Sequence, residues 1–241
     1  MKKIVSITFL LSLIILTMCS QSQKIIYQFN GEDTPYFRDW LLCGPFPNCP
    51  DCDPMDYKHD ERCKGFYTDY LESIGGEQDV LPQNTTEINL LDLGIKRSWF
   101  HYHSETDKIP FNSIFEPNDM VVAYAFCQVN SNNQQKAILS LGSNDGIKVF
   151  LNGEKIHENH PLDGRWLQKD NDYVPINLKE GVNNFLFKVD EGTGDFGLVV
   201  RLLNYDSTKT AIRNNLENPS ALKCRQRLRQ RRKEKKNILN P

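Results

Sequence analysis

Hydrophobic and polar residues alternate through the middle of the chain in short runs separated by turn residues. Two such runs lie between Leu139 and Gly153, on either side of residues 144–146, Asn-Asp-Gly. Alternation with a period of two is typical of half-buried β-strands. Asp-Gly and Asn-Gly pairs favour tight hairpin turns because they tolerate positive φ. The pattern therefore predicts an antiparallel hairpin across residues 144–146, followed by a second turn at residues 152–153.

Similar runs recur about every ten residues as far as Tyr205, punctuated by Gly and Asn. This spacing favours an all-β fold, an antiparallel β-sandwich. Residues 120–129 are apolar on both faces, which indicates a central strand. One short helix is predicted over residues 68–76, with Thr68 as its N-terminal cap and Gly75 as its left-handed end.

The N-terminus has the features of an export signal. Lys2 and Lys3 precede an apolar run over residues 4–18, which is too short for a stable membrane span. We expect residues 1–22 to be removed by ordinary cleavage, with acylation at Cys19 as the alternative. The protein is then exported, to the periplasm, the cell surface or the medium, and reaches a membrane only if Cys19 is lipidated.

Charge is distributed unevenly along the chain. Residues 223–236 hold nine Lys or Arg and one Glu, a net charge of +8, and Lys2 with Lys3 adds +2. Because the whole chain carries −2, the remainder carries −12. We expect a β-sandwich domain over residues 23–206 and a basic tail over 207–241, disordered or a solvated helix. The tail lacks interleaved aromatic residues, so an anionic envelope polymer fits it better than nucleic acid.

Four of the seven cysteines lie within one acidic stretch, residues 43–63. In an exported protein such a cluster predicts two disulfides that fix a surface insertion, with three possible pairings. A zinc site is the alternative, since residues 49–52 form a C-x-x-C motif and His59 follows. The predicted disulfide cysteines are Cys43, Cys49, Cys52 and Cys63.

Several motifs together resemble a known family. They are residues 40–46 (WLLCGPF), 65–71 (GFYTDYL), 75–77 (GGE), 124–125 (YA), 142–153 (GSNDGIKVFLNG), 181–183 (GVN) and 187–189 (FKV). Over residues 25–205 the chain is similar to the galactose-binding-like jelly-roll modules of exported Bacteroidetes-type hydrolases that act on glycans or esters. The resemblance implies a jelly-roll accessory module. Its cysteine-rich insertion is unusual for that family. In that family the module usually continues into a catalytic domain, whereas this sequence ends after a basic tail, so we expect either a module that acts alone or a shortened reading frame.

Sugar binding requires an exposed aromatic ring and flanking hydrogen-bonding groups. One loop after the predicted hairpin carries these residue types, and we take its members as candidate ligand-binding residues: Trp166, Arg165, Asp163, His157 and His160. The alternative interpretation of Trp166 is a core residue. Sugar binding of this kind requires no cofactor. A structural calcium ion could nevertheless be held by Asp190, Glu191 and Asp195, which surround two glycines.

The sequence therefore predicts an exported, non-catalytic module that binds a polysaccharide or other glycan. Two alternatives stay open. Loop carboxylates could form the acid pair of a small hydrolase or lyase, drawn from Asp145, Glu158, Asp163 and Asp190. The chain could instead be a protein-interaction module without a sugar ligand.

Overall fold

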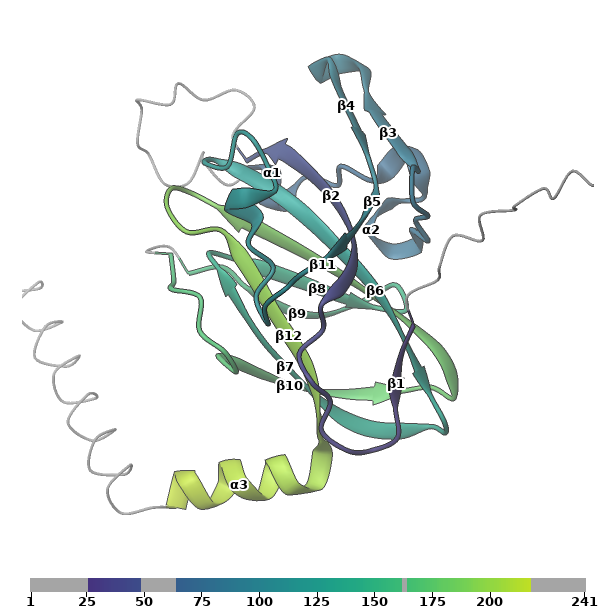
Figure 1. Cartoon of the computed structure of the whole chain (residues 1–241), viewed down its shortest axis with the longest axis vertical. Helices are drawn as coiled ribbons and strands as arrows, with labels where there is room; N and C mark the ends of the chain where they lie inside the picture. The colour runs from purple at the N-terminus through teal and green to yellow at the C-terminus, as the bar shows by residue number, and fades with distance from the viewer. Residues whose placement is uncertain (1–25, 49–63, 162–163, 218–241) are drawn as a thin grey trace, which may run out of the picture.

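The computed structural model describes residues 26–48, 64–161 and 164–217. The strands form two β-sheets packed face to face and a separate two-stranded hairpin (Figure 1). The larger sheet has the strand order β5-β2-β6-β11-β8-β9, and β1 pairs in parallel with one end of β6. Its strands are β1 (Ile26–Phe29), β2 (Asp39–Pro47), β5 (Phe100–His103), β6 (Val121–Ser131), β8 (Ile147–Leu151), β9 (Glu154–Asn159) and β11 (Gly181–Glu191).

The smaller sheet has the order β10-β7-β12 and is antiparallel. Its strands are β7 (Gln135–Asn144), β10 (Asp172–Leu178) and β12 (Gly197–Asn204). Apolar side chains from both sheets form one buried core between them. The predicted all-β sandwich is confirmed.

Strand β6 shows how the sequence pattern specifies the layers. Val121 and Ala123 face the core between the sheets. Val122 and Tyr124, one position along, belong to a second buried cluster on the opposite face of the large sheet. Because successive side chains of a strand point to opposite faces, a central strand covered on both sides must be apolar throughout.

The hairpin predicted across residues 144–146 is wrong. Strand β7 ends at Asn144 and β8 begins at Ile147, but they belong to different sheets and pair with other strands. The Asn-Asp-Gly turn instead connects a strand of the small sheet to a strand of the large sheet. The second predicted turn is confirmed, because Asn152 and Gly153 have positive φ and connect the paired strands β8 and β9.

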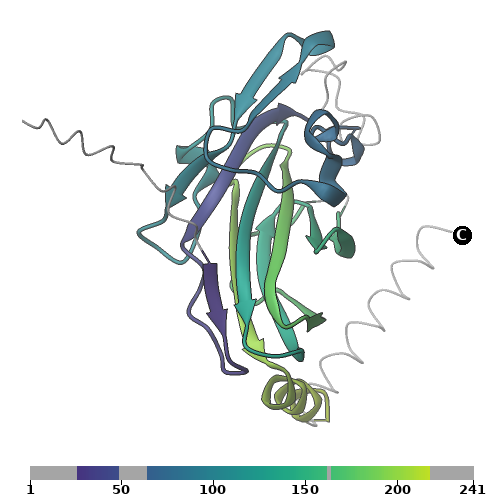
Figure 2. The ribbon, with the colours of Figure 1, turned by 90° about the vertical axis from the view of Figure 1, so that its right-hand side faces the viewer.

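The outer face of the large sheet is covered by the segment between β2 and β5. This segment contains α1 (Lys64–Tyr67), η1 (Glu72–Ile74), α2 (Gly76–Asp79), and the hairpin of β3 (Glu87–Leu90) and β4 (Ile95–Ser98) joined by η2 (Leu91–Leu93). The hairpin projects at the end of the molecule opposite to helix α3 (Tyr205–Glu217) (Figures 1 and 2). A further short helix, η3 (Phe111–Ser113), lies between β5 and β6.

Two local predictions need correction. The helix expected over residues 68–76 is a series of turns around η1, although Gly75 does adopt the left-handed conformation. Cys43, expected in a disulfide, carries a free thiol that is fully buried in the outer cluster. Its side chain shares that cluster with Phe46, as an apolar residue would, and burial raises the pKa of the thiol to about 12.

Other predictions lie outside the described residues. These concern the export signal with Cys19, the remaining cysteines of the cluster (Cys49, Cys52 and Cys63), Asp163 and most of the basic tail. The first part of the tail is helix α3, which is largely exposed over residues 205–213. Within the described ranges, no helix is both long enough and apolar enough to cross a membrane.

Candidate functional site

Arg165 fixes the loop that precedes β10. Its backbone N–H donates to Asp145 Oδ1 (3.0 Å), and its Nε donates to the Asp145 carbonyl oxygen (3.0 Å). Its two terminal nitrogens donate to Asp172 Oδ2 and to Ser143 Oγ, both at 2.6 Å. Only 10% of the side chain is exposed. Arg165, predicted as a ligand group, therefore joins this loop to the ends of β7 and β10.

Trp166 is the next residue, and 77% of it is exposed. The alternative interpretation as a core residue is therefore wrong. The loop then continues over the outer face of the small sheet, where the Gln168 carbonyl oxygen would lie 1.9 Å from a Cβ atom on Gly142. Trp166 is thus an exposed indole on a backbone that is anchored on both sides.

The two predicted histidines occupy different environments. His157 on β9 lies 3.3 Å from Asp172, which also binds Arg165. Burial raises the pKa of the Asp172 carboxyl, but its hydrogen bonds with His157 and Arg165 outweigh burial and lower the pKa below its usual value. His160 instead stacks on Phe66 of α1, with ring centroids 4.3 Å apart. The structure joins Arg165 and His157 through Asp172, whereas His160 packs against α1.

Asp190 holds His160 in place beside Gly146. The Asp190 carboxylate lies 3.0 Å from His160 Nε2 and accepts hydrogen bonds from Asn48 Nδ2 (2.9 Å) and the Gly146 N–H (2.8 Å). A Cβ atom on Gly146 would lie 2.3 Å from both Asp190 Oδ1 and the His160 ring. Only glycine allows this approach.

We expect Gly146→Ala to lower the free energy of unfolding by about 1–3 kcal/mol, because the added methyl group must displace buried groups. Urea unfolding measures this change. Gly192→Ala is the matched control, since its Cβ would meet its nearest neighbour at an ordinary 3.5 Å. Equal stability of the two variants would contradict the close packing of Gly146 against His160.

The three predicted calcium ligands do not converge. Asp190 and Glu191 are consecutive on β11, so their side chains point to opposite faces of the sheet. Asp195 is largely exposed and lies 3.8 Å from Lys108. In the described part of the chain, no three His, Cys, Asp or Glu side chains gather closely enough to hold a metal ion. The arrangement does not fit the predicted calcium site.

Of the carboxylates considered for an acid pair, Asp163 lies outside the described residues, and Asp145, Glu158 and Asp190 each have a structural partner. Asp145 accepts the backbone N–H groups of Arg165 and Gly192. Glu158 lies 2.5 Å from Lys155, and this hydrogen bond lowers its pKa. A general acid needs a raised pKa, which Glu158 does not have.

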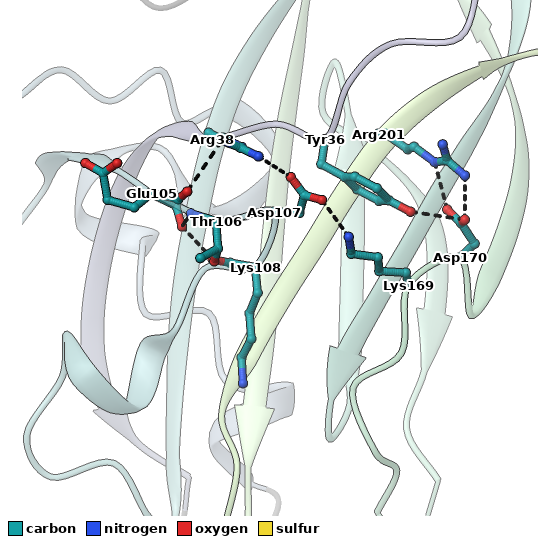
Figure 3. A network of polar contacts seen from close by, with 10 residues as sticks. Tyr36, Arg38, Glu105, Thr106, Asp107, Lys108, Lys169, Asp170 and Arg201 are labelled. Carbon is teal, nitrogen blue, oxygen red and sulfur yellow. Dashed lines mark hydrogen bonds and ion pairs between the residues drawn. The ribbon is translucent and has the colours of Figure 1, made fainter.

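A polar network that the sequence did not suggest lies on the outer face of the small sheet (Figure 3). At its centre, Asp170 accepts two hydrogen bonds from the Arg201 guanidinium, one from Ser140 Oγ (2.6 Å) and one from Tyr36 (3.1 Å). Burial raises the pKa of Asp170, but Arg201 and Ser140 bring it below its usual value. Burial and the bond to Asp170 raise the pKa of Tyr36 to about 12.

The network continues through a second carboxylate. Asp107 lies between Arg38 and Lys169, 2.5 Å from each. The Lys169 Nζ and Arg201 Cζ atoms each lie 4.7 Å from the centre of the Tyr36 ring. Arg201 could have been suspected from sequence, because it is the single charged residue in the apolar run of β12. Its partners come from distant loops, which no sequence spacing reveals.

Tyr173 extends this surface on β10. It is 44% exposed and pairs in register with Ser140, whose hydroxyl binds Asp170. The surface that we call the small-sheet face therefore comprises Trp166, Tyr173, Tyr36, Asp170, Lys169 and Arg201. It combines exposed aromatic rings with charged groups held in fixed positions.

No protein-family model matches the sequence, and no match was found among curated proteins. Similar solved structures include a β-glucosidase from Kluyveromyces marxianus, with a TM-score of 0.36 and 17% identity over 48% of this chain. The chain spans 15% of the length of that enzyme. A family 35 carbohydrate binding module from Clostridium thermocellum has a TM-score of 0.26 and 18% identity, over 36% of this chain and 72% of the module.

Proposed function

We propose that the protein is an exported, non-catalytic carbohydrate-binding module, and that its small-sheet face contacts the glycan. The observation that carries the proposal is the exposure of Trp166 beside the anchored Arg165. The flat apolar surface of an exposed indole matches the C–H face of a pyranose ring. Because Arg165 holds the backbone, little conformational entropy is lost when the ring is covered.

The polar groups of the same face support hydrogen bonding to sugar hydroxyls. Lys169 follows Trp166 by three residues, and about half of its side chain is exposed. Arg201 and Asp170 hold each other in one orientation. Fixed polar groups beside an aromatic ring give a site its orientation and specificity.

We expect Trp166→Ala to weaken retention by a soluble polysaccharide at least tenfold, the equivalent of about 1.4 kcal/mol. Stacking on an exposed ring accounts for a loss of this size. Affinity electrophoresis against separate soluble glucans, xylans, mannans and galactans measures it, with release of reducing ends followed in parallel. The melting temperature should not change, since Trp166 is exposed.

Tyr67→Ala is the control, because Tyr67 is also an exposed aromatic residue (61%) but lies on α1, away from the small-sheet face. Equal retention of Trp166→Ala and wild type would contradict the proposed contact. Release of new reducing ends would contradict the non-catalytic part of the proposal. Absence of retention by every polysaccharide would favour a protein-interaction module.

A further inference from the structure

The outer face of the large sheet contains a groove beside α2, on the opposite side of the sandwich from the small-sheet face. Its floor consists of the outward side chains Phe126 on β6, Leu186 on β11 and Phe150 on β8, all buried. Its cavity has a volume of about 160 Å³. A second cavity of about 350 Å³ shares Phe150 and the α2 residues as its wall. The second cavity alone has the size of a small ligand site.

Amide side chains form the rim of this groove. Asn152, Asn184 and Gln78 line it, together with Lys179 and Leu81, which is 64% exposed. Within the described part of the chain, neither the Gln78 amide nor Asn184 Nδ2 makes a hydrogen bond. The Asn184 Oδ1 atom accepts a bond from Gln128 (2.7 Å), and Asn152 Oδ1 accepts the Asn184 N–H (2.9 Å). Asn152 Nδ2 donates to Asn183 Oδ1 (3.0 Å), so the rim amide groups left for a ligand are the Gln78 amide and Asn184 Nδ2.

The groove is held open by direct packing between its walls. A Cβ atom on Gly153, in the turn between β8 and β9, would lie 2.5 Å from the Gln78 carbonyl oxygen. The turn and α2 therefore touch through their backbones. Glu77 is anchored at the inner end of the groove by Tyr124 and Lys188, both at 2.7 Å. The rim groups are thus positioned before any ligand arrives.

We propose that this groove is a second glycan-binding site, for an uncharged sugar unit of a polysaccharide. An apolar floor covers the C–H face of a pyranose. The Gln78 amide offers both a donor and an acceptor to neighbouring hydroxyls, and Asn184 Nδ2 offers a further donor. Four acidic residues line the adjoining cavity, Asp69, Glu72, Glu77 and Asp79. They disfavour uronic acids and sulfated sugars through like-charge repulsion. The site does not depend on Trp166.

Nuclear magnetic resonance of the ¹⁵N-labelled full chain tests this proposal, because Asn and Gln side-chain amides give separate signals. Cello-, xylo-, manno- and galacto-hexaoses are the probes, each titrated alone. We expect one of them to shift the side-chain signals of Gln78, Asn152 and Asn184, in the wild type and equally in Trp166→Ala. The Gln78→Ala/Asn184→Ala variant should bind that probe at least tenfold more weakly at the groove.

Asn89→Ala is the matched control, as an exposed asparagine on the β3–β4 hairpin. The two proposals can fail separately. If a hexaose shifts the groove signals but Trp166→Ala does not change retention by polysaccharide, the groove site is supported and the proposed contact of Trp166 is contradicted. Shifts confined to residues near Trp166 would overturn the groove and leave the proposed function intact. Absence of groove shifts with every hexaose would also overturn it.

Discussion

Glu191→Gln is expected to stabilise the protein by about 2–3 kcal/mol at pH 7 and to remove most of its loss of stability between pH 5 and pH 9. Glu191 is fully buried at the end of β11, and no hydrogen-bond donor in the described part of the chain reaches either carboxylate oxygen. Burial raises its pKa to about 9, and the neighbouring carboxylates of Asp145 and Asp190 add to this. A buried unpaired charge is costly, so the folded protein keeps Glu191 protonated.

The direction of the pH dependence follows from proton binding. The unfolded chain loses this proton near pH 4.5, whereas the folded protein holds it until about pH 9. The stability associated with Glu191 is therefore complete below pH 4.5 and is lost as the pH rises toward 9, by about 1.4 kcal/mol per unit at most. Glutamine is neutral at every pH and has nearly the same shape, so the variant lacks this slope.

Urea unfolding at one-unit pH intervals measures the effect. Asp195→Asn is the matched control: it also removes a carboxylate from this end of the sandwich, but from an exposed side chain. We expect it to follow the wild type within about 0.5 kcal/mol. Parallel pH profiles of Glu191→Gln and wild type would show that Glu191 is ionised in the folded protein.

The layers of the sandwich could be predicted from sequence because burial acts on every second residue of a strand. Alternation along the predicted strand over residues 120–129 assigns Tyr124 and Ala125 to opposite faces, and the structure places them so. Pairing between strands was less predictable. The same Asn-Asp-Gly sequence can close a hairpin or connect two sheets, and the partners of β7 and β8 lie far along the chain. Local turn chemistry does not distinguish these outcomes.

The candidate site also combines features that sequence could predict with features that it could not. The place of Trp166 in a polar loop could be inferred from the residue types around it, but the choice between an exposed ring and a core position needed the structure. The role of Arg165 could not, because its partners Asp145 and Asp172 are brought together only by the crossover between sheets. Asp170 was likewise missed, since Tyr36 lies 134 residues away in the chain. Sequence indicates which residue types are present, whereas tertiary packing decides whether they bind a ligand or one another.

Two lysines on the outer face of the large sheet show most clearly that sequence alternation does not predict which polar side chains are buried. Lys148 and Lys188 alternate with apolar residues, which in sequence is typical of a solvent-facing position. They are register partners on β8 and β11, and both are buried beneath residues 64–80. Like charges directly opposite each other destabilise a sheet. The covering segment compensates through its own groups: Lys148 donates to the Phe66 carbonyl oxygen (2.8 Å), and Lys188 donates to Glu77.

Lys188→Ala is therefore expected to lower the free energy of unfolding by about 3–5 kcal/mol. Lys188 Nζ donates to Glu77 Oε1 (2.7 Å) and to the Thr68 carbonyl oxygen. Removing the side chain leaves the largely buried Glu77 carboxylate with Tyr124 as its remaining neutral donor. It also opens a cavity between β11 and the segment that covers it. Urea unfolding at pH 7 measures the loss.

A second variant separates charge from packing. Lys188→Met/Glu77→Gln keeps an unbranched side chain, removes both charges and retains an acceptor for Tyr124. We expect it to recover more than half of the stability lost in Lys188→Ala, because a buried ion pair replaced by neutral groups of similar volume costs little. Lys155→Ala is the control: its ion pair with Glu158 is exposed and contributes at most about 1 kcal/mol. If Lys188→Ala cost no more than this control, Lys188 would not hold residues 64–80 against the sheet.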